Sequence, residues 1–405
     1  MNDLTKQLNE MLENDELIES LTVLPPIKRD IKSKSEKLLA ILDIYKIFIP
    51  NKYTVEIYNR LYLSVVSSLE KKNTINEVEI LNKNFQAIKD IKHYGVSGGL
   101  DSFKITGSAG LGKTSSMHRC ADIIFNHVIK TKAPIREIIP ILFVECVSDG
   151  SFKSLLYSIL EEVDKRLSTS YFRANKHQTT TVDTLLAAVS NVLTNHVALL
   201  VIDEVERMAN DSKKGETLIN YLTQLVNQSN ISICFVGNES SNSYFEKKEY
   251  LARRTVGISI QKMNYDEQFF KFLKILFSYQ YTNKHISLTG EIAQTIFKLS
   301  NGIPAIIVSL FVETQRNAIL NDEDCISSQL FMTTFKLYFT NLLPFINQSE
   351  FVKQRCKHNK GNDEVIKKQF DSNDDLFKEV SLLAKKDLNI AIDYLQKYIS
   401  VEFVQ

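Results

Sequence analysis

The sequence predicts an α/β protein with a central parallel sheet flanked by helices, and with further helices on both sides of the sheet region. From about Gly95, short apolar runs rich in β-branched and aromatic residues alternate with longer stretches of helical spacing. Such alternation is typical of strands that pair in parallel and carry helices on both faces. The expected strands are Ser102–Thr106, Ile138–Cys146, Val197–Ile202 and Ile231–Val236.

Helical patterns before and after this region divide the 405-residue chain into four expected parts. Before it, Tyr58, Leu61, Tyr62, Val65 and Leu69 recur at three- and four-residue steps, which predicts an amphipathic helix. After it, the chain is wholly helical in pattern from Asp266 to about Leu320 and then becomes polar and charged. The expected parts are a helical extension at 1–92, an α/β core at 93–264, a helical lid at 265–345 and a polar, partly helical tail at 346–405.

Charge and composition restrict the classes of function. Lys and Arg number 49 and Asp and Glu number 48, so any nucleic-acid binding has to use a local patch. The N-terminus is acidic without an apolar segment, and no apolar run reaches about 18 residues, which argues against a signal peptide or a membrane span. Five scattered cysteines without a CxxC pair argue against a disulfide framework or zinc site and favour a reducing, cytoplasmic location.

A glycine-rich segment follows the first expected strand. Residues Gly107–Thr114 fit the pattern GxxxxGK[ST] and open an expected helix, Ser115–Ile129. Glycines let the backbone wrap a polyphosphate, successive N–H groups and the helix N-terminus point at it, and the lysine adds a cation. The alternative is a glycine-rich turn that matches by chance. The candidate nucleotide-binding residues are Gly107, Ser108, Ala109, Gly110, Leu111, Gly112, Lys113, Thr114 and Ser115.

Two acids end the strand Val197–Ile202. A carboxylate at the carboxyl end of a parallel strand lies where ligands of α/β sheets bind. We expect Asp203, with the hydroxyl of Thr114, to hold Mg²⁺, and Glu204 to polarise an attacking water. Acids at strand ends also serve as N-caps of the next helix, which is the alternative. Because no NKxD-like guanine signature follows the P-loop, Gly107–Thr114, ATP is preferred over GTP.

Two later residues complete the candidate catalytic set. If the strand Ile231–Val236 lies between the other two, Asn238 can reach the attacking water or the terminal phosphate. The alternative is a turn asparagine. Arg253, chosen over Arg254, can reach a neighbouring subunit's nucleotide and stabilise developing charge. Its alternative is a solvated or DNA-facing basic pair. The candidate catalytic residues are therefore Lys113, Glu204, Asn238 and Arg253.

Taken together, these segments resemble one family, the TnsC/TniB-type AAA+ regulators of transposition, close to the initiator branch of AAA+ ATPases. The likeness runs from about Tyr94 to Leu320, and Ala252-Arg-Arg within this range fits one of the family's later motifs. Many ATPases share the P-loop and the Asp-Glu strand. The more specific segments are Phe143–Leu155, with its Cys and DGSxKxL pattern, and Ser300–Phe311, with NGIPA.

The resemblance implies a P-loop AAA+ fold with a helical lid, and an ATPase that forms rings or filaments on duplex DNA. Such proteins link a target selector to transposase subunits, and hydrolysis disassembles them. The position of Asn238 is the family's first sensor. A basic, aromatic-containing stretch at 151–177 could follow a phosphate backbone, or it could be an ordinary surface helix. The candidate DNA contacts are Lys153, Lys165, Arg166, Arg173 and Lys176.

The sequence departs from AAA+ proteins at the expected second sensor. The helix after Asn301-Gly-Ile-Pro304 has Glu313, Gln315 and Arg316 as its first long polar residues, so a lid arginine at the nucleotide is in doubt. The tail is interpreted as a docking element for a transposase subunit. Two other classes of function stay open: an initiator-type helicase loader or DNA motor, and a signalling switch that binds no nucleic acid.

Overall fold

The computed structural model describes residues 4–29, 31, 33–72, 102–125, 127–130, 137–147, 151–177, 179–209, 212–229, 231–242 and 256–343. By contacts the chain divides into two compact units, Met1–Thr340 and Asn341–Gln405. The second unit lies almost wholly outside the described residues. The tail at 346–405, interpreted above as a docking element, lies wholly outside them.

A six-stranded sheet in the order β2-β3-β4-β5-β1-β6 forms the centre of the α/β region. Strands β3 to β6 and β1 pair in parallel, and only β2 is antiparallel to its neighbour β3. The α/β fold with helices on both faces is confirmed, and the sheet is mixed because of β2. The strands are β1 (Phe103–Thr106), β2 (Ile129–Lys130), β3 (Glu137–Glu145), β4 (Val197–Asp203), β5 (Ser232–Gly237) and β6 (Ile258–Ser259).

The expected helix Ser115–Ile129 is too long at its C-terminal end. Helix α5 spans Lys113–Ile124, and Phe125 leaves it with extended backbone. Ile129 instead pairs with Ile138 at the sheet edge and is fully buried. The two-residue strand β2 is too short to give a pattern of its own in the sequence.

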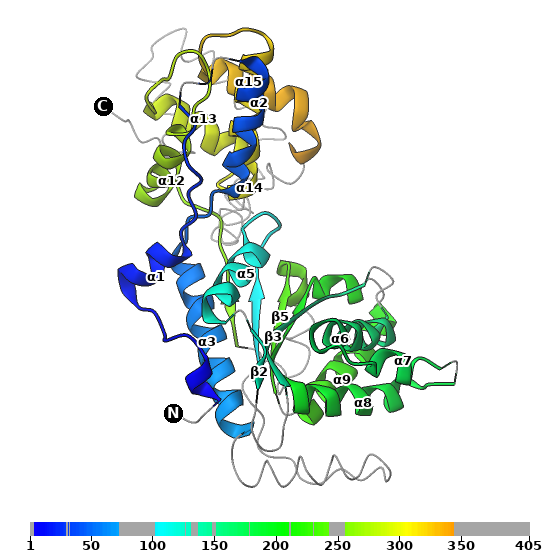
Figure 1. Ribbon diagram of the computed structural model, residues 1–405. Coiled ribbons are helices and arrows are strands. Elements are labelled where there is room, and N and C mark those ends of the chain that lie inside the picture. The colour runs from blue at the N-terminus through cyan, green and yellow to red at the C-terminus, as the bar shows by residue number, and fades with distance from the viewer. Residues whose placement is uncertain are drawn as a thin grey trace, which may run out of the picture. The chain divides into compact units, whose positions relative to one another are not determined.

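Two apolar layers cover the two faces of the sheet (Figure 1). In β4, Leu200 and Ile202 pack with α6, α8 and α9, whereas Leu199 and Val201 pack with α3 and α5. Since successive strand side chains point to opposite faces, one buried run serves both layers. The helices are α3 (Lys52–Lys72) and α5 on one face, and α6 (Phe152–Leu167), α8 (Val182–His196) and α9 (Ser212–Ser229) on the other.

Short elements connect these helices and strands. Helix α7 (Tyr171–Asn175) follows α6. The 3-10 turns η4 (Val205–Ala209) and η5 (Glu239–Ser241) follow β4 and β5, at the carboxyl edge of the sheet.

The N-terminal residues pack on two different parts of the chain. Helix α1 (Asn14–Leu21), which follows the 3-10 turn η1 (Thr5–Gln7), lies on α5, and the Arg119 side chain of α5 donates hydrogen bonds to the carbonyls of Ser20 and Leu21. Helix α2 (Lys34–Ala40) and the 3-10 turn η2 (Ile41–Lys46) pack instead on α14, far along the chain. Val23, before α2, and Phe48, after η2, form an isolated antiparallel bridge. Helix α3 begins four residues after Phe48.

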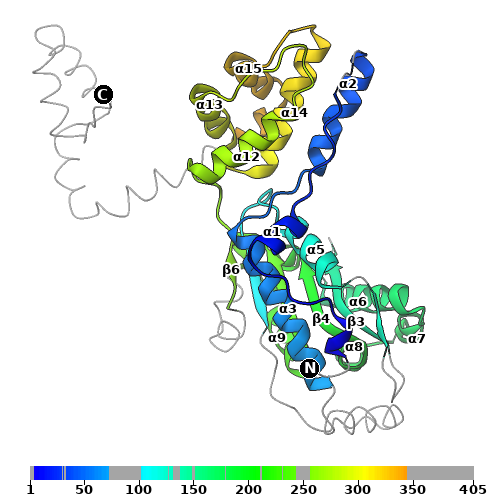
Figure 2. The ribbon, with the colours of Figure 1, turned by 60° about the vertical axis from the view of Figure 1, so that its left-hand side comes forward.

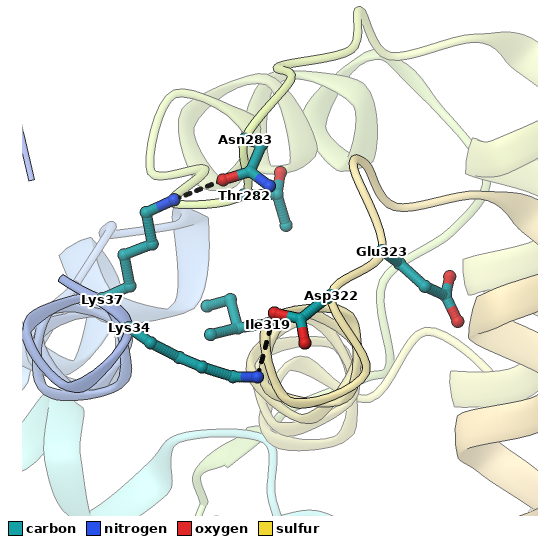
Figure 3. Close-up of a pocket in the computed structure, with 7 residues that line it drawn as sticks. All are labelled: Lys34, Lys37, Thr282, Asn283, Ile319, Asp322 and Glu323. Atoms are coloured by element: carbon teal, nitrogen blue, oxygen red, sulfur yellow. Dashed lines mark hydrogen bonds and ion pairs between the residues drawn. The ribbon is translucent and has the colours of Figure 1, made fainter. Parts of the chain in front are cut away.

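Four helices follow β6: α12 (Glu267–Phe277), α13 (Gly290–Ser300), α14 (Pro304–Leu320) and α15 (Ser328–Tyr338), with a 3-10 turn η6 (Thr340–Leu342) after them. Figure 2 shows α2 beside this group of helices. Two lysines of α2 reach across to it around a cavity of about 120 Å³ (Figure 3). Lys34 bonds Asp322 at 3.0 Å and Lys37 bonds Asn283 at 2.6 Å.

No single helix of the described ranges is long and apolar enough to cross a membrane. The pair α13 and α14 passes that test only together, by length and composition, with a bend of 119° between them.

Candidate nucleotide site

The P-loop connects β1 to α5 at the carboxyl edge of the sheet. Gly107, Gly110 and Gly112 have φ of 154°, 81° and 83°, in the region that favours glycine. A Cβ on Gly107 would lie 2.7 Å from the Ile260 carbonyl oxygen, so glycine is needed there for close approach as well. Of the remaining cradle residues, Ser108 and Leu111 are partly or fully buried, and Ala109 and Ser115 are exposed.

Lys113 is the first residue of α5, and its ammonium folds back over the loop. Its Nζ donates to the carbonyls of Gly107 at 2.7 Å and Ser108 at 3.0 Å. Burial lowers the pKa of Lys113 below its ordinary value, and nearby carboxylates, Glu206 first and then Asp203, oppose that shift. The Lys113 ammonium is thus held by two carbonyl oxygens of the loop itself.

Asp203 and Thr114 are brought together although 89 residues separate them. The Thr114 hydroxyl donates to Asp203 Oδ2 at 2.7 Å, and the Glu204 backbone N–H donates to Asp203 Oδ1 at 2.8 Å. The Asp203 side chain is buried, and the hydroxyl comes from the first turn of α5. A hydroxyl and a carboxylate in contact form an all-oxygen donor pair of the kind that Mg²⁺ prefers.

Glu204 lies one residue further along, in a left-handed conformation with φ of 57°. Its carboxylate forms an ion pair with Arg207, one turn later in η4. Arg207 also donates Nη1 to the Cys146 carbonyl, just past the end of β3, at 3.2 Å. The Glu204 and Arg207 side chains keep 38% and 42% of their exposure, although the paired oxygen Oε2 is itself buried.

Strand β5 lies between β4 and β1, which is the arrangement that the interpretation of Asn238 required. Asn238 directly follows β5, and its Oδ1 accepts hydrogen bonds from the backbone N–H of Ser240 at 2.9 Å and its hydroxyl at 2.5 Å. In this state the side chain therefore caps η5. Asn238 thus lies at the carboxyl edge of the sheet with extended backbone and caps the turn that follows.

Sequence reasoning missed several residues of this edge. Glu206 accepts a hydrogen bond from the Asn238 backbone N–H at 3.1 Å, and Glu239 accepts one from the Ser108 hydroxyl at 3.0 Å. The three-residue spacing from Glu204 to Arg207 was a usable signal, since it places both on one side of a helical turn. Glu239 gave no such signal, because its partner lies 131 residues away.

The first turn of α14 also contacts the P-loop. The Ala305 N–H donates to the Gly110 carbonyl at 3.1 Å, and a Cβ on Gly110 would lie 3.0 Å from Ile303 Cγ2. The polar residues considered for a second sensor lie further along the helix. Gln315 is buried and bonds the backbone of Tyr279 and Tyr281, and Arg316 pairs with Glu313.

The candidate DNA contacts lie on α6, on α7 and at the C-cap of α7, Lys176, and they are not equivalent. Lys153 donates to the Thr180 carbonyl at 2.7 Å, and Lys165 pairs with Glu162 at 2.5 Å. Lys176 lies over the Phe172 ring at 4.6 Å from its centroid. Arg166, Arg173 and Lys176 are exposed, as is the paired Lys165.

Arg253, the candidate finger, and its neighbour Arg254 lie outside the described residues. So do Asp149 and Gly150 of the DGSxK segment. Ser151 of that segment caps α6, its side chain accepting from the Ser154 N–H at 3.0 Å.

Comparisons with known proteins agree with the fold. Residues 100–245, which contain the P-loop and both acids, match the family model described as "AAA domain". No curated protein matches the chain in sequence. Solved structures also match, and the three described next have TM-scores below 0.5.

One such structure is the Aeropyrum pernix ORC1 protein in complex with DNA, at 11% identity and TM-score 0.48, over 93% of this chain and 85% of that one. Another is Drosophila ORC bound to DNA, at 12% identity and TM-score 0.43, over 99% and 86%. A third is domain III of Thermotoga maritima DnaA, at 11% identity and TM-score 0.38, over 78% and 100%. The α/β region of this chain has the P-loop fold of AAA+ proteins, and residues 100–245 are similar to AAA domains.

Proposed function

We propose that the chain is an ATPase that binds ATP and Mg²⁺ at the P-loop, oligomerises on duplex DNA in the ATP state and regulates transposition. The observation that carries the ATPase part is the bond of the Thr114 hydroxyl to Asp203, next to Lys113 and Glu204. A chance glycine-rich turn gives no reason for a buried acid to meet the residue after the P-loop lysine.

Each residue has a separate task in this proposal. Lys113 exchanges its loop carbonyls for phosphate oxygens, and the backbone N–H groups of 107–115 hold the rest of the polyphosphate. Thr114 and Asp203 hold Mg²⁺, which supplies charge neutralisation at the phosphates when bound. Glu204 orients and polarises the attacking water, and Asn238 turns from its cap of η5 toward that water.

The helices α12 to α15 are assigned as the lid, in contact with the loop through Ala305 and Gly110. Arg253 is assigned as the finger that acts on a neighbouring subunit's nucleotide. Both assignments follow the resemblance to AAA+ regulators of transposition.

DNA binding is proposed at α6 and α7. The exposed Arg166, Arg173 and Lys176 stand near one another in sequence, and the whole chain has a net charge of only +1. A local cation group of this kind contacts phosphates, which gives little sequence preference and a strong salt dependence. The proposed protein partners are other copies of this chain, transposase subunits and a target selector.

Fluorescence anisotropy of a labelled DNA duplex tests this proposal. Wild-type protein should bind with ATP and release the duplex as ATP is consumed, whereas Glu204→Gln should stay bound. Increasing the salt concentration should weaken both complexes, because each phosphate contact releases counterions.

The outcomes separate the alternatives. Hydrolysis of ATP without formation of any DNA complex would favour a nucleotide switch that acts on proteins. Directional unwinding or translocation on DNA would favour a loader or motor. Either result would remove the transposition proposal and leave the nucleotide site in place.

A further inference from the structure

Arg207 is the one cation that bonds the Glu204 carboxylate within the described residues. We propose that Arg207 is a positioning residue, which fixes the carboxylate of Glu204 for its work on the attacking water. This inference rests on the proposed ATPase function, because it assigns a partner to the proposed general base.

The contacts of Arg207 explain how it can do this. Its Nη2 pairs with Glu204 Oε2, and its Nη1 donates to the carbonyl of Cys146. Cys146 is itself fixed, since its N–H donates to the Asp203 carbonyl at 2.9 Å. The guanidinium is therefore attached at two points, one on the acid and one on the neighbouring strand's end.

Glu204 needs such support. It lies past the end of β4 with φ of 57°, where the backbone of a non-glycine residue is rarely found, and its side chain is partly exposed. A glutamate has three side-chain torsions, and a base serves well only when it is held in one orientation. With Oε2 held by Arg207, Oε1 is the oxygen that can accept a bond from water. Among the described residues Oε1 has no hydrogen bond, and the buried Oε2 has the ion pair with Arg207 in place of one.

The same turn is fixed on its other side. Glu206, adjacent to Arg207, accepts from the Asn238 N–H at the end of β5. The turn η4 is thus bonded toward β3 by Arg207 and toward β5 by Glu206, with Asp203 and Glu204 between them. A base oriented by a third group is the general arrangement of activated sites.

The test compares Arg207→Ala and Arg207→Lys with a matched control, Arg60→Ala. Arg60 also pairs with a glutamate one turn away, Glu56 at 2.7 Å, and also donates Nη1 to a backbone carbonyl, that of Val256 at 3.2 Å. It lies on α3, and neither of its partners belongs to the candidate nucleotide site. The control therefore reports the general effect of removing a half-exposed arginine with two bonds.

Steady-state ATP hydrolysis gives kcat and KM, and a fluorescent ATP analogue gives the nucleotide Kd. Arg207→Ala should lower kcat by roughly 10- to 100-fold, the usual effect of removing a group that orients a site residue, with Kd within about twofold of wild type. Arg207→Lys should recover part of kcat, because it keeps the charge but loses the two-point attachment. Arg60→Ala should match wild type in kcat and Kd.

Three results contradict the inference. Equal kcat for Arg207→Ala and Arg60→Ala shows that Glu204 needs no such partner, and a higher kcat shows that the pair restrains the base. A rise in the nucleotide Kd that accompanies the fall in kcat indicates a folding or binding role instead. A wild type without turnover, although it binds the analogue, overturns the proposed ATPase function itself, which is a distinguishable failure.

Discussion

At the scale of single residues, the glycines of the P-loop are required for different reasons. Gly107 combines a φ of 154° with a backbone oxygen 2.7 Å from where a Cβ would be. Gly112 has a φ of 83° but nothing within 4 Å of its Cβ position. A side chain at Gly107 is therefore opposed by both backbone conformation and lack of space, and a side chain at Gly112 by backbone conformation alone.

Replacing these glycines should therefore have unequal effects on stability. Gly112→Ala should lower the free energy of unfolding by about 1–3 kcal/mol, from backbone strain alone. Gly107→Ala should lower it further, since the Ile260 carbonyl must also move. Denaturant unfolding of both variants measures the difference, and equal losses would show that the contact with Ile260 does not matter.

Lys113 predicts a pH dependence of the nucleotide-free protein. Its pKa is lowered in the fold by burial, so between that lowered pKa and its ordinary value of 10.5 the unfolded chain binds more protons. Stability from this group should accordingly rise with pH in that window. The difference in thermal midpoint between wild type and Lys113→Met, followed from pH 7 to 10, isolates the effect. A difference that is flat with pH, or that moves in the opposite direction, would be inconsistent with a buried ammonium.

At the scale of elements, the sequence predicted the strands well and their surroundings less well. The four long strands lie within one residue of the expected runs, because each is a buried run of β-branched and apolar side chains. Strands β2 and β6 were missed, since two residues carry no period. The pairing of α2 and η2 with α14 was missed as well, because it joins residues about 280 positions apart and depends on tertiary contacts.

The packing of η2 on α14 predicts a large effect at one position. Ile44 is fully buried although η2 is only a 3-10 turn, while Leu42 beside it is 51% exposed. Ile44→Ala should lower the free energy of unfolding by about 2–5 kcal/mol. The matched control Leu42→Ala should change it by less than about 0.5 kcal/mol. Similar values for the two variants in denaturant unfolding would argue that η2 does not pack as described.

Helices α6 and α7 carry the proposed DNA surface, and Asp164 holds them together. Its two carboxylate oxygens accept from the N–H groups of Tyr171 and Phe172, both at 2.8 Å. Alanine at both Arg166 and Arg173 should reduce the slope of log K against log salt concentration by about 2, because each phosphate contact contributes about 0.9. Alanine at both Lys271 and Lys298, exposed cations of α12 and α13, is the charge-matched control. An unchanged slope in the Arg166 and Arg173 variant would place the DNA elsewhere.

At the scale of the whole molecule, the site could be located from the sequence, and its connections could not. The P-loop pattern and the Asp203-Glu204 pair were visible as local motifs, and the parallel sheet explains why they meet at one edge. The contacts of Arg207 with Cys146 and of Ala305 with Gly110 depend on how distant segments pack. These contacts connect the edge of the sheet to β3 and to α14, and no local pattern encodes them.

The most direct test of the central claim is steady-state ATP hydrolysis by wild type and by Glu204→Gln, with and without duplex DNA. We expect hydrolysis by wild type, stimulation by DNA that weakens with salt, and a loss of about 100-fold or more in the Gln variant with ATP binding retained. Wild-type hydrolysis that Glu204→Gln leaves unchanged, or no hydrolysis under any of these conditions, would contradict the assignment of this sheet edge as an ATPase site.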